Sequence, residues 1–259
     1  MRNGFLRCVF GRVWYALNIK SGLVMTGAST YENAKKAQPR PSHGALRGHA
    51  DHCPEALRGH WLEHFPGHQA LHLELGCGKG RFTADTAAQN PGIFLAAIEK
   101  VPDAMVVGME RVTERGLENV RFLDRDAANL LDMFAPGEVS RIYINFPDPW
   151  KKSRQHKRRL TYAGFLALYA NVLPLGGEIW FKTDNDPLFA FSLEQFEQEG
   201  WELREVTHDL HADGPVGVMT DYEAKFYDQG ITINRCVAVK TEDTKCDLYP
   251  GTSTGCAPV

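Results

Sequence analysis

The chain has 259 residues, of which 43% are hydrophobic, and it carries a formal net charge of −3. This length suits one α/β domain with extra segments at its ends, and the apolar fraction is sufficient for a sizeable core. The slightly acidic balance argues against a protein that is basic over its whole surface, although a local basic patch is enough to bind RNA. A run of about 18 apolar residues is absent, so a membrane span is not expected.

The six cysteines do not have the spacing that metal sites use. None forms a Cys-x-x-Cys pair, and no group of histidine and cysteine has the spacing of a zinc site. A metal is therefore not expected. The pattern suits a reducing compartment, and we expect a cytoplasmic location.

Three parts of the chain differ in composition. Residues 1–54 show no sustained hydrophobic period and contain several prolines, glycines and histidines, so we expect an irregular N-terminal extension. Residues 55–240 alternate between apolar runs and helical patterns and form the predicted domain. Residues 241–259, with threonine, glycine and proline, predict a flexible C-terminal tail.

Within the domain, strand-like runs and helical patterns follow one another in order. The expected strands are Ala70–Leu75, Ile93–Glu99, Val120–Leu123, Arg141–Phe146, Glu178–Thr183, Trp201–Thr207 and Ile231–Val239. The expected helices are Arg81–Gln89, Pro102–Arg115, Ala127–Phe134, Tyr162–Val172 and Pro187–Gly200. This alternation predicts a mostly parallel seven-stranded sheet with helices on both faces, closed by an antiparallel pair. Ligands of such sheets bind beyond the carboxyl ends of the strands.

The first strand leads into a glycine-rich segment, Glu74–Gly80. Gly76, Gly78 and Gly80 permit a tight turn and a close approach of a ligand to the backbone. A dinucleotide fingerprint would need glycine at position 81, where Arg81 stands. Glu74 would repel a pyrophosphate but suits the ammonium group of a methionine moiety. These four residues therefore favour S-adenosylmethionine as ligand, with a plain strand-to-helix turn as the alternative.

Carboxylates also follow the next two strands. Glu99 can accept both ribose hydroxyls of an adenosine, which fits S-adenosylmethionine and NAD alike, or it can pair with Lys100 at the surface. Asp126 can accept a hydrogen bond from the adenine amino group, but it is equally suited to cap the helix that follows.

The fourth strand ends in Asn-Phe-Pro-Asp-Pro-Trp, residues 145–150. The prolines on either side of Asp148 stiffen the loop, because each fixes its own φ and restrains the residue before it. A rigid carboxylate beside an aromatic ring at the carboxyl end of a strand is typical of an active site. We predict Asp148 as the catalytic residue; a proline-rich turn beside a core tryptophan is the alternative.

A strongly basic run follows at once, with six Lys or Arg among residues 151–159. Such a run is usually a solvated face, but here it adjoins the predicted catalytic loop, where a polyanionic substrate would need its charge neutralised. We expect phosphate contacts from the following residues: Lys152, Arg154, Lys157, Arg158 and Arg159. Asp184 closes the fifth strand. Thr220, Asp221, Tyr222 and Glu223 lie in a predicted loop between the last two strands, where Thr220 and Glu223, taken by themselves, would be ordinary surface residues.

At these residues the chain resembles the bacterial single-subunit tRNA (guanine-N7)-methyltransferase family. The resemblance spans about residues 60 to 240, in the expected order. It rests on Glu74–Gly80, Ala97–Glu99, Arg125–Ala127, Asn145–Leu160, Thr183–Asn185 and Thr220–Phe226. It implies a Rossmann-like class I S-adenosylmethionine-dependent fold. It also implies methyl transfer to N7 of the variable-loop guanine, nucleotide 46, of tRNA, by a monomer or a homodimer.

By the same resemblance, the cofactor contacts include Glu74, Glu99, Asp126 and Asp148. The substrate contacts include Lys152, Asp184 and Thr220–Glu223, and the basic run meets RNA. Since guanine N7 carries a free lone pair, the reaction needs no base, and catalysis is mainly positioning and electrostatics.

Other functions remain as alternatives. A methyltransferase acting on an exocyclic amine is suggested loosely by Asn145–Asp148, although Phe146 precedes the proline. An NAD-dependent oxidoreductase is disfavoured by Arg81. A non-enzymatic RNA-binding module with this fold would not need Asp148, Asp184 and Glu223.

Overall fold

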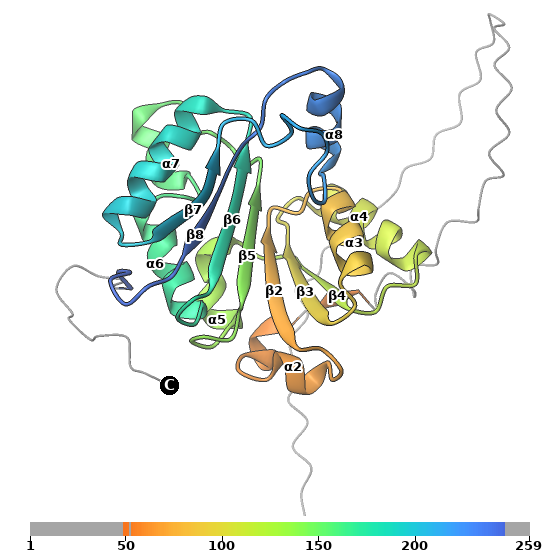
Figure 1. Cartoon of the computed structure of the whole chain (residues 1–259). Helices are drawn as coiled ribbons and strands as arrows, with labels where there is room; N and C mark the ends of the chain where they lie inside the picture. Colours follow the sequence, from red (N-terminus) through yellow and green to blue (C-terminus); the bar gives the residue numbers. More distant parts are fainter. Residues whose placement is uncertain (1–48, 52, 247–259) are drawn as a thin grey trace, which may run out of the picture. The chain divides into compact units, whose positions relative to one another are not determined.

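The computed structural model describes residues 49–51 and 53–246, and these form one twisted sheet with helices on both faces (Figure 1). The strands are β1 (Ala50–Asp51), β2 (Ala70–Leu75), β3 (Ile93–Ile98), β4 (Val120–Leu123), β5 (Arg141–Asn145), β6 (Glu178–Thr183), β7 (Glu202–Thr207) and β8 (Asn234–Val239). Their order in the sheet is β1-β4-β3-β2-β5-β6-β8-β7. Strand β8 runs antiparallel to its neighbours, β6 and β7, and the other pairs are parallel. All seven predicted strands are present, and β1 adds a short edge strand.

The helices connect these strands. They are η1 (Pro54–Leu57), α2 (Trp61–His64), α3 (Arg81–Gln89), α4 (Pro102–Glu114), η2 (Ala127–Asn129), α5 (Leu130–Met133), η3 (Ser153–Arg158), α6 (Ala163–Val172), α7 (Asp186–Gln198) and α8 (Asp221–Asp228). Proline lies in the first turn of α4 and of α7, where its missing N–H has no intrahelical partner to lose. Among the described residues, no helix is both long and apolar enough to cross a membrane.

Two apolar clusters form the core, one on each face of the sheet. Leu71, Leu73 and Leu75 of β2 pack with residues of α5, α6 and α7, whereas Leu95 and Ala97 of β3 pack with residues of α3 and α4. Because parallel strands are buried on both faces, β3 reads as a continuous apolar run in the sequence. This burial fixes the carboxyl ends of the strands relative to one another.

Four details differ from the prediction. The sheet already begins at Ala50, which pairs with Phe122 of β4, before the predicted domain boundary. The helix predicted over residues 127–134 is divided into a 3-10 turn and one turn of α-helix. The segment that begins at Thr220, predicted as a loop, is instead the start of α8, because the Thr and Glu that looked like surface residues form a capping box. Residues 241–246 also make hydrogen bonds, from Thr241 and Thr244 to the carbonyl oxygen of Gly200.

Candidate active site

A cavity of about 600 Å³ lies where the chain crosses from one half of the sheet to the other, beyond the carboxyl ends of β2, β3 and β5. This is the switch point at which open α/β sheets bind ligands. Residues from β2, the glycine loop and the β5 loop line it, together with the start of α8. They are Glu74, Gly76, Cys77, Gly78, Lys79, Gly80, Arg81, Phe82, Glu99, Val101, Ala104, Asn145, Phe146, Asp148, Thr220, Asp221, Tyr222 and Lys225.

Glu74 lies near the end of β2 with its carboxyl group buried in the cavity wall. Its side chain is 1% exposed, and Thr83 donates a hydrogen bond of 2.6 Å to its Oε2 atom. Burial raises the pKa of Glu74 to about 7, and the nearby Thr83, Asn145 and Lys182 oppose this shift. The Asn145 side chain lies near the Glu74 carboxyl group, and its buried Nδ2 atom has no well-formed hydrogen bond among the described residues. The wall thus offers a carboxyl group to a cationic group of a ligand, and an amide donor to an acceptor group of the same ligand.

The three glycines of the loop have two different functions. Gly76 and Gly78 have φ of +74° and +54°, and a Cβ atom at either position would meet nothing within 4 Å, so both face open space in the cavity. At Gly80, however, a Cβ atom would lie 2.6 Å from the Cα atom of Gly108. Gly76 and Gly78 therefore give a ligand access to the backbone, and Gly80 allows α3 to pack closely on α4.

Glu99 holds the glycine loop in place. Its Oε2 atom accepts a hydrogen bond of 2.8 Å from the backbone N–H of Gly78, and its Oε1 atom accepts one of 2.8 Å from that of Val101. Each carboxylate oxygen keeps a second lone pair for a ligand hydroxyl. The carboxylate is thus oriented before any ligand binds.

Asp148 lies on a loop whose backbone is constrained at both ends. Phe146 and Trp150 have φ of 52° and 40°, values that non-glycine residues rarely adopt and that cluster at functional sites. The Phe146 N–H donates to the carbonyl oxygen of Lys182 at 2.8 Å. Nε of Arg159 donates to the Pro149 carbonyl oxygen at 2.9 Å. The loop is therefore rigid, and it presents the exposed Asp148 side chain to the cavity.

Arg159, predicted as a phosphate contact, lies deeper than the other basic residues of the run. It is 6% exposed, and its guanidinium group also packs over the Phe191 ring at 4.3 Å, so it supports the Asp148 loop from within. Arg158 remains exposed and stacks on the Trp150 ring at 3.9 Å. Lys152, Arg154 and Lys157 are exposed as well, as predicted for a surface that meets a polyanion.

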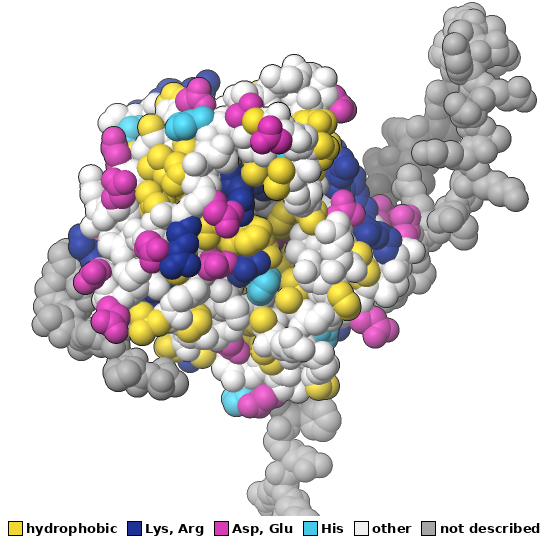
Figure 2. Space-filling model, in the orientation of Figure 1, with side chains coloured by type: hydrophobic (Ala, Val, Ile, Leu, Met, Phe, Trp, Pro, Cys, Tyr) yellow, Lys and Arg dark blue, Asp and Glu magenta, His cyan; other side chains and the backbone are white. Residues whose placement is uncertain are grey.

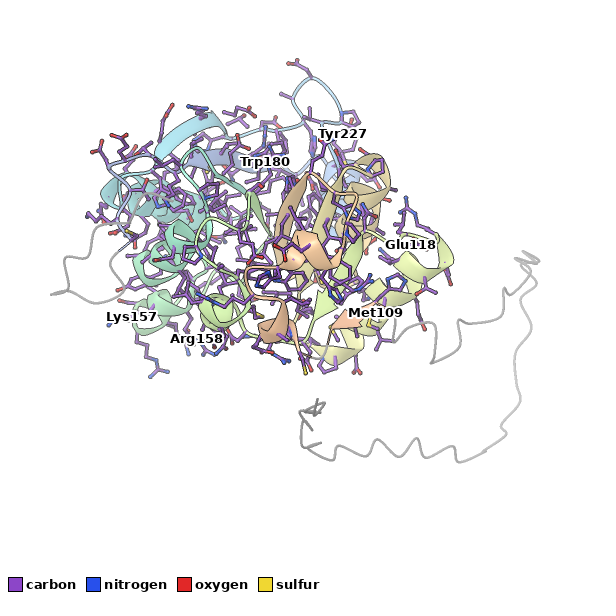
Figure 3. The ribbon with its side chains drawn as sticks, turned by 90° about the horizontal axis from the view of Figure 1, so that it is seen from below. Met109, Glu118, Lys157, Arg158, Trp180 and Tyr227 are labelled. Atoms are coloured by element: carbon purple, nitrogen blue, oxygen red, sulfur yellow. The ribbon has the colours of Figure 1, made fainter. Side chains whose placement is uncertain are left out.

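The basic run and α8 flank the site from different sides. Figure 3 shows Lys157 and Arg158 at one margin of the molecule and Tyr227 of α8 at the opposite one. Lys157 is exposed in the same way as its neighbour.

Glu223 is also not the surface residue that its sequence context suggests. It is 0% exposed, its Oε2 atom accepts from Lys182 Nζ at 2.6 Å, and its Oε1 atom lies 3.1 Å from His211 Nε2. Thr220 Oγ1 accepts from the Glu223 N–H at 3.0 Å, and the Thr220 N–H donates back to the Glu223 carboxylate. Glu223 thus anchors the start of α8 from within.

Comparisons with known proteins agree with this geometry. Residues 68–236 match the model of a family described as "Putative methyltransferase". A tRNA (guanine-N(7)-)-methyltransferase of Streptococcus suis is 47% identical over 186 residues, which are 71% of this chain and 88% of that protein. One of Geobacillus kaustophilus is also 47% identical, over 72% of this chain and 87% of its own length.

The chain belongs to the tRNA (guanine-N7)-methyltransferase family. Among solved structures, an antibiotic-related methyltransferase is similar with a TM-score of 0.54 at 16% identity, and the match covers 71% of this chain and 93% of that one. The 16S rRNA methyltransferase KamB has a TM-score of 0.52 at 14% identity, with the same coverage. At such identities these two similarities support the fold, which is that of class I methyltransferases.

Asp126 and Asp184 are among the predicted site residues that lie outside the cavity wall. Asp126 caps η2, where its Oδ1 atom accepts from the Ala128 N–H at 3.0 Å, and its Oδ2 atom lies 3.5 Å from Lys100 Nζ. Asp184 is exposed just after β6 and is not among the lining residues. Among the described residues, no group of His, Cys, Asp or Glu could hold a metal ion.

Sequence reasoning misses two residues that the site uses. Asn145 enters it only as part of a motif, and Lys182 only as a near neighbour of Asp184. Both are polar residues at the ends of adjacent strands, since Asn145 pairs with Lys182 in the register of β5 and β6. A polar residue at the end of an otherwise apolar strand is the signal that the sequence offers.

Proposed function

We propose that this chain transfers the methyl group of S-adenosylmethionine to N7 of the variable-loop guanine, nucleotide 46, of tRNA. The observation that carries the proposal is the rigid Asp148 loop at the mouth of a cavity that is otherwise suited to the cofactor. The names of two relatives that are each 47% identical to this chain support the same reaction.

The cavity fits S-adenosylmethionine in size and in chemistry. Its volume of about 600 Å³ lies in the range of ligand sites. Glu74 would receive the ammonium group, and the Nδ2 donor of Asn145 would suit an acceptor of the same ligand, such as its carboxylate. Glu99 would accept hydrogen bonds from the ribose hydroxyls, and Gly76 and Gly78 leave room along the backbone. When bound, the cofactor supplies an electrophilic methyl group on a sulfonium. Asp126 is proposed to accept a hydrogen bond from the adenine amino group.

Asp148 is proposed to hold the guanine. Guanine N7 has a free lone pair, so its attack requires no proton removal and no nucleophilic side chain. The ring becomes cationic as it is methylated, and a fixed carboxylate that accepts from guanine N1–H and the amino group stabilises that charge. The constrained loop keeps Asp148 in place before the substrate arrives, so little reorganisation is needed. Asp184 is proposed as a second polar contact at the same end of the sheet.

Four exposed basic residues beside the Asp148 loop are proposed to bind the tRNA backbone. They are Lys152, Arg154, Lys157 and Arg158. Their charges, in a chain of net charge −3, concentrate the attraction for phosphate next to the site. A cytoplasmic location and a monomer or homodimer remain part of the proposal.

The direct test is to incubate the full chain with S-adenosylmethionine labelled on its methyl group and with unmodified tRNA. The methylated nucleotide is then mapped by chemical cleavage at 7-methylguanine. We expect cleavage at nucleotide 46, and none in a transcript with adenine at that position. Label that enters both transcripts equally would contradict the proposed target.

A further inference from the structure

Helix α8 covers the cavity without an apolar core of its own. Thr220, which caps it, and its residues Asp221, Tyr222 and Lys225 line the cavity. Glu223 is the one buried residue of this fully described helix, and Tyr222 is 66% exposed. The half-buried Phe226 ring of α8 packs against Phe146 with the centroids 6.1 Å apart, and the Tyr227 ring packs against His211. Since most helices are held by a buried apolar face, charged contacts should contribute more than usual to the position of α8.

The inner contact of α8 is a buried charge cluster. Glu223 accepts from Lys182 of β6, and Lys182 also donates to the carbonyl oxygen of Val218 at 3.0 Å. Burial lowers the pKa of Lys182, and the adjacent Glu223 opposes this shift. This contact is shielded from water and therefore from salt.

The outer contact is an exposed ion pair to the other side of the cavity. Asp221 Oδ2 accepts from Arg111 of α4 at 2.9 Å, and Asp221 Oδ1 lies 3.9 Å from Arg81 of α3. The side chains of Arg111 and Asp221 are 34% and 44% exposed. Figure 2 shows basic and acidic side chains side by side over α3 and α4. Arg111 and Asp221 are 110 positions apart in the chain, so this pair ties α8 to α4, and each of these helices contributes a residue to the cavity lining.

We propose that Arg111 is a positioning residue: through Asp221 it holds α8 against α4 and so completes the wall of the cofactor cavity. Asp221 then serves the fold of the site and is not a contact of the substrate, because guanidinium groups already occupy its carboxylate and a free carboxylate would repel phosphate. The inference rests on the proposed assignment of this cavity to the cofactor.

The consequence is a cofactor affinity that depends on salt even without RNA. An exposed ion pair changes an equilibrium by up to about fivefold, and salt weakens it as the screening length falls from about 10 Å at 0.1 M to about 3 Å at 1 M. Breaking the pair should loosen α8, and with it the residues that close the cavity over a bound ligand.

The test measures the dissociation constant of S-adenosylhomocysteine by calorimetry, with the full chain, in low and high salt, without RNA. Arg111→Gln should weaken binding about two- to fivefold in low salt and reduce the salt dependence. The matched control is Arg115→Gln, because Arg115 follows on from α4 but pairs with Asp85 of α3 at 2.6 Å and has no ion pair with α8. This control should bind as the wild type does.

A double-mutant cycle separates positioning from direct contact. Asp221→Asn alone and together with Arg111→Gln should weaken binding by nearly the same factor, since each change breaks one shared pair. Additive effects would overturn the proposal, because Asp221 would then act on its own. An unchanged affinity in Arg111→Gln would overturn it as well.

The affinity of Glu99→Gln for S-adenosylhomocysteine shows which of two proposals fails: the positioning role of Arg111, or the assignment of the cavity to the cofactor. If Glu99→Gln weakens binding and Arg111→Gln does not, only the positioning role of Arg111 fails. If Glu99→Gln also binds normally, the assignment of the cavity to the cofactor fails, and the inference fails with it.

Discussion

The two walls of the cavity are built by different interactions. On the wall formed by β2 and β3, Glu74 and Glu99 are buried, and backbone N–H groups hold the Glu99 carboxylate in place. On the wall formed by α8, an exposed ion pair, one buried charge cluster and ring contacts at the margin hold a helix whose one buried residue is Glu223. The first wall is fixed by the fold itself. The second is the part of the site that single charges and salt should be able to move.

The largest effect on stability should come from the buried cluster of the α8 wall. Lys182→Met leaves Glu223 buried beside His211 without its main counter-charge, and breaking such a pair typically costs about 3–5 kcal/mol. The free energy of unfolding is measured by urea denaturation. Lys100→Met is the matched control, since Lys100 pairs with Asp126 at the surface and its replacement should cost less than about 1 kcal/mol. Equal destabilisation of both variants would contradict the described role of Lys182.

The largest effect on rate should come from Asp148. Asp148→Ala removes one preorganised charge contact, so methyl transfer to tRNA should fall about 100- to 1,000-fold. The side chain is exposed, and the free energy of unfolding should therefore change little. The measurement is the single-turnover rate with saturating cofactor. Near-normal turnover in a folded Asp148→Ala chain would rule out this role.

On the rigid wall, cofactor affinity should depend on pH through Glu74. Burial raises its pKa to about 7, so below that pH the free protein holds this carboxyl group protonated and neutral. The ammonium group of the cofactor prefers the carboxylate, so affinity should rise as pH increases toward 7, by at most about tenfold per pH unit. Calorimetry in buffers of different ionisation enthalpy should detect proton release on binding at pH ~6. Glu74→Gln should bind more weakly and lack this pH dependence; a pH dependence that persists in Glu74→Gln must have another source.

The basic run should affect RNA binding alone. Lys157→Gln with Arg158→Gln removes two exposed charges, which should lower the slope of log affinity against log salt by about 1 for each phosphate that the protein no longer neutralises. Affinity for the cofactor should not change. Lys245→Gln is a suitable control, because Lys245 is also exposed but lies by Glu199 at the end of α7. An unchanged slope in the double variant would place the tRNA elsewhere.

Sequence patterns predict the parts of the site that are local. The glycine loop, Glu99 and the proline-flanked Asp148 are each specified within a few residues, and β2, β4 and β6 have their predicted bounds. Patterns cannot show which charges are paired over long distances. The guanidinium group of Arg159 turns inward to the Asp148 loop, Asp221 pairs with Arg111, and Glu223 pairs with Lys182. Each of these pairings depends on how the elements meet in space, so a run of charged residues looks more exposed in the sequence than it is.

The central claim is that the reacting atom is N7 of the guanine. A tRNA with 7-deazaguanine at nucleotide 46 replaces that nitrogen with a C–H group and keeps the edge that Asp148 is proposed to hold. We predict that this tRNA competes with unmodified tRNA for binding but accepts no labelled methyl group at nucleotide 46. Methyl transfer to the 7-deazaguanine, at its amino group for example, would contradict it.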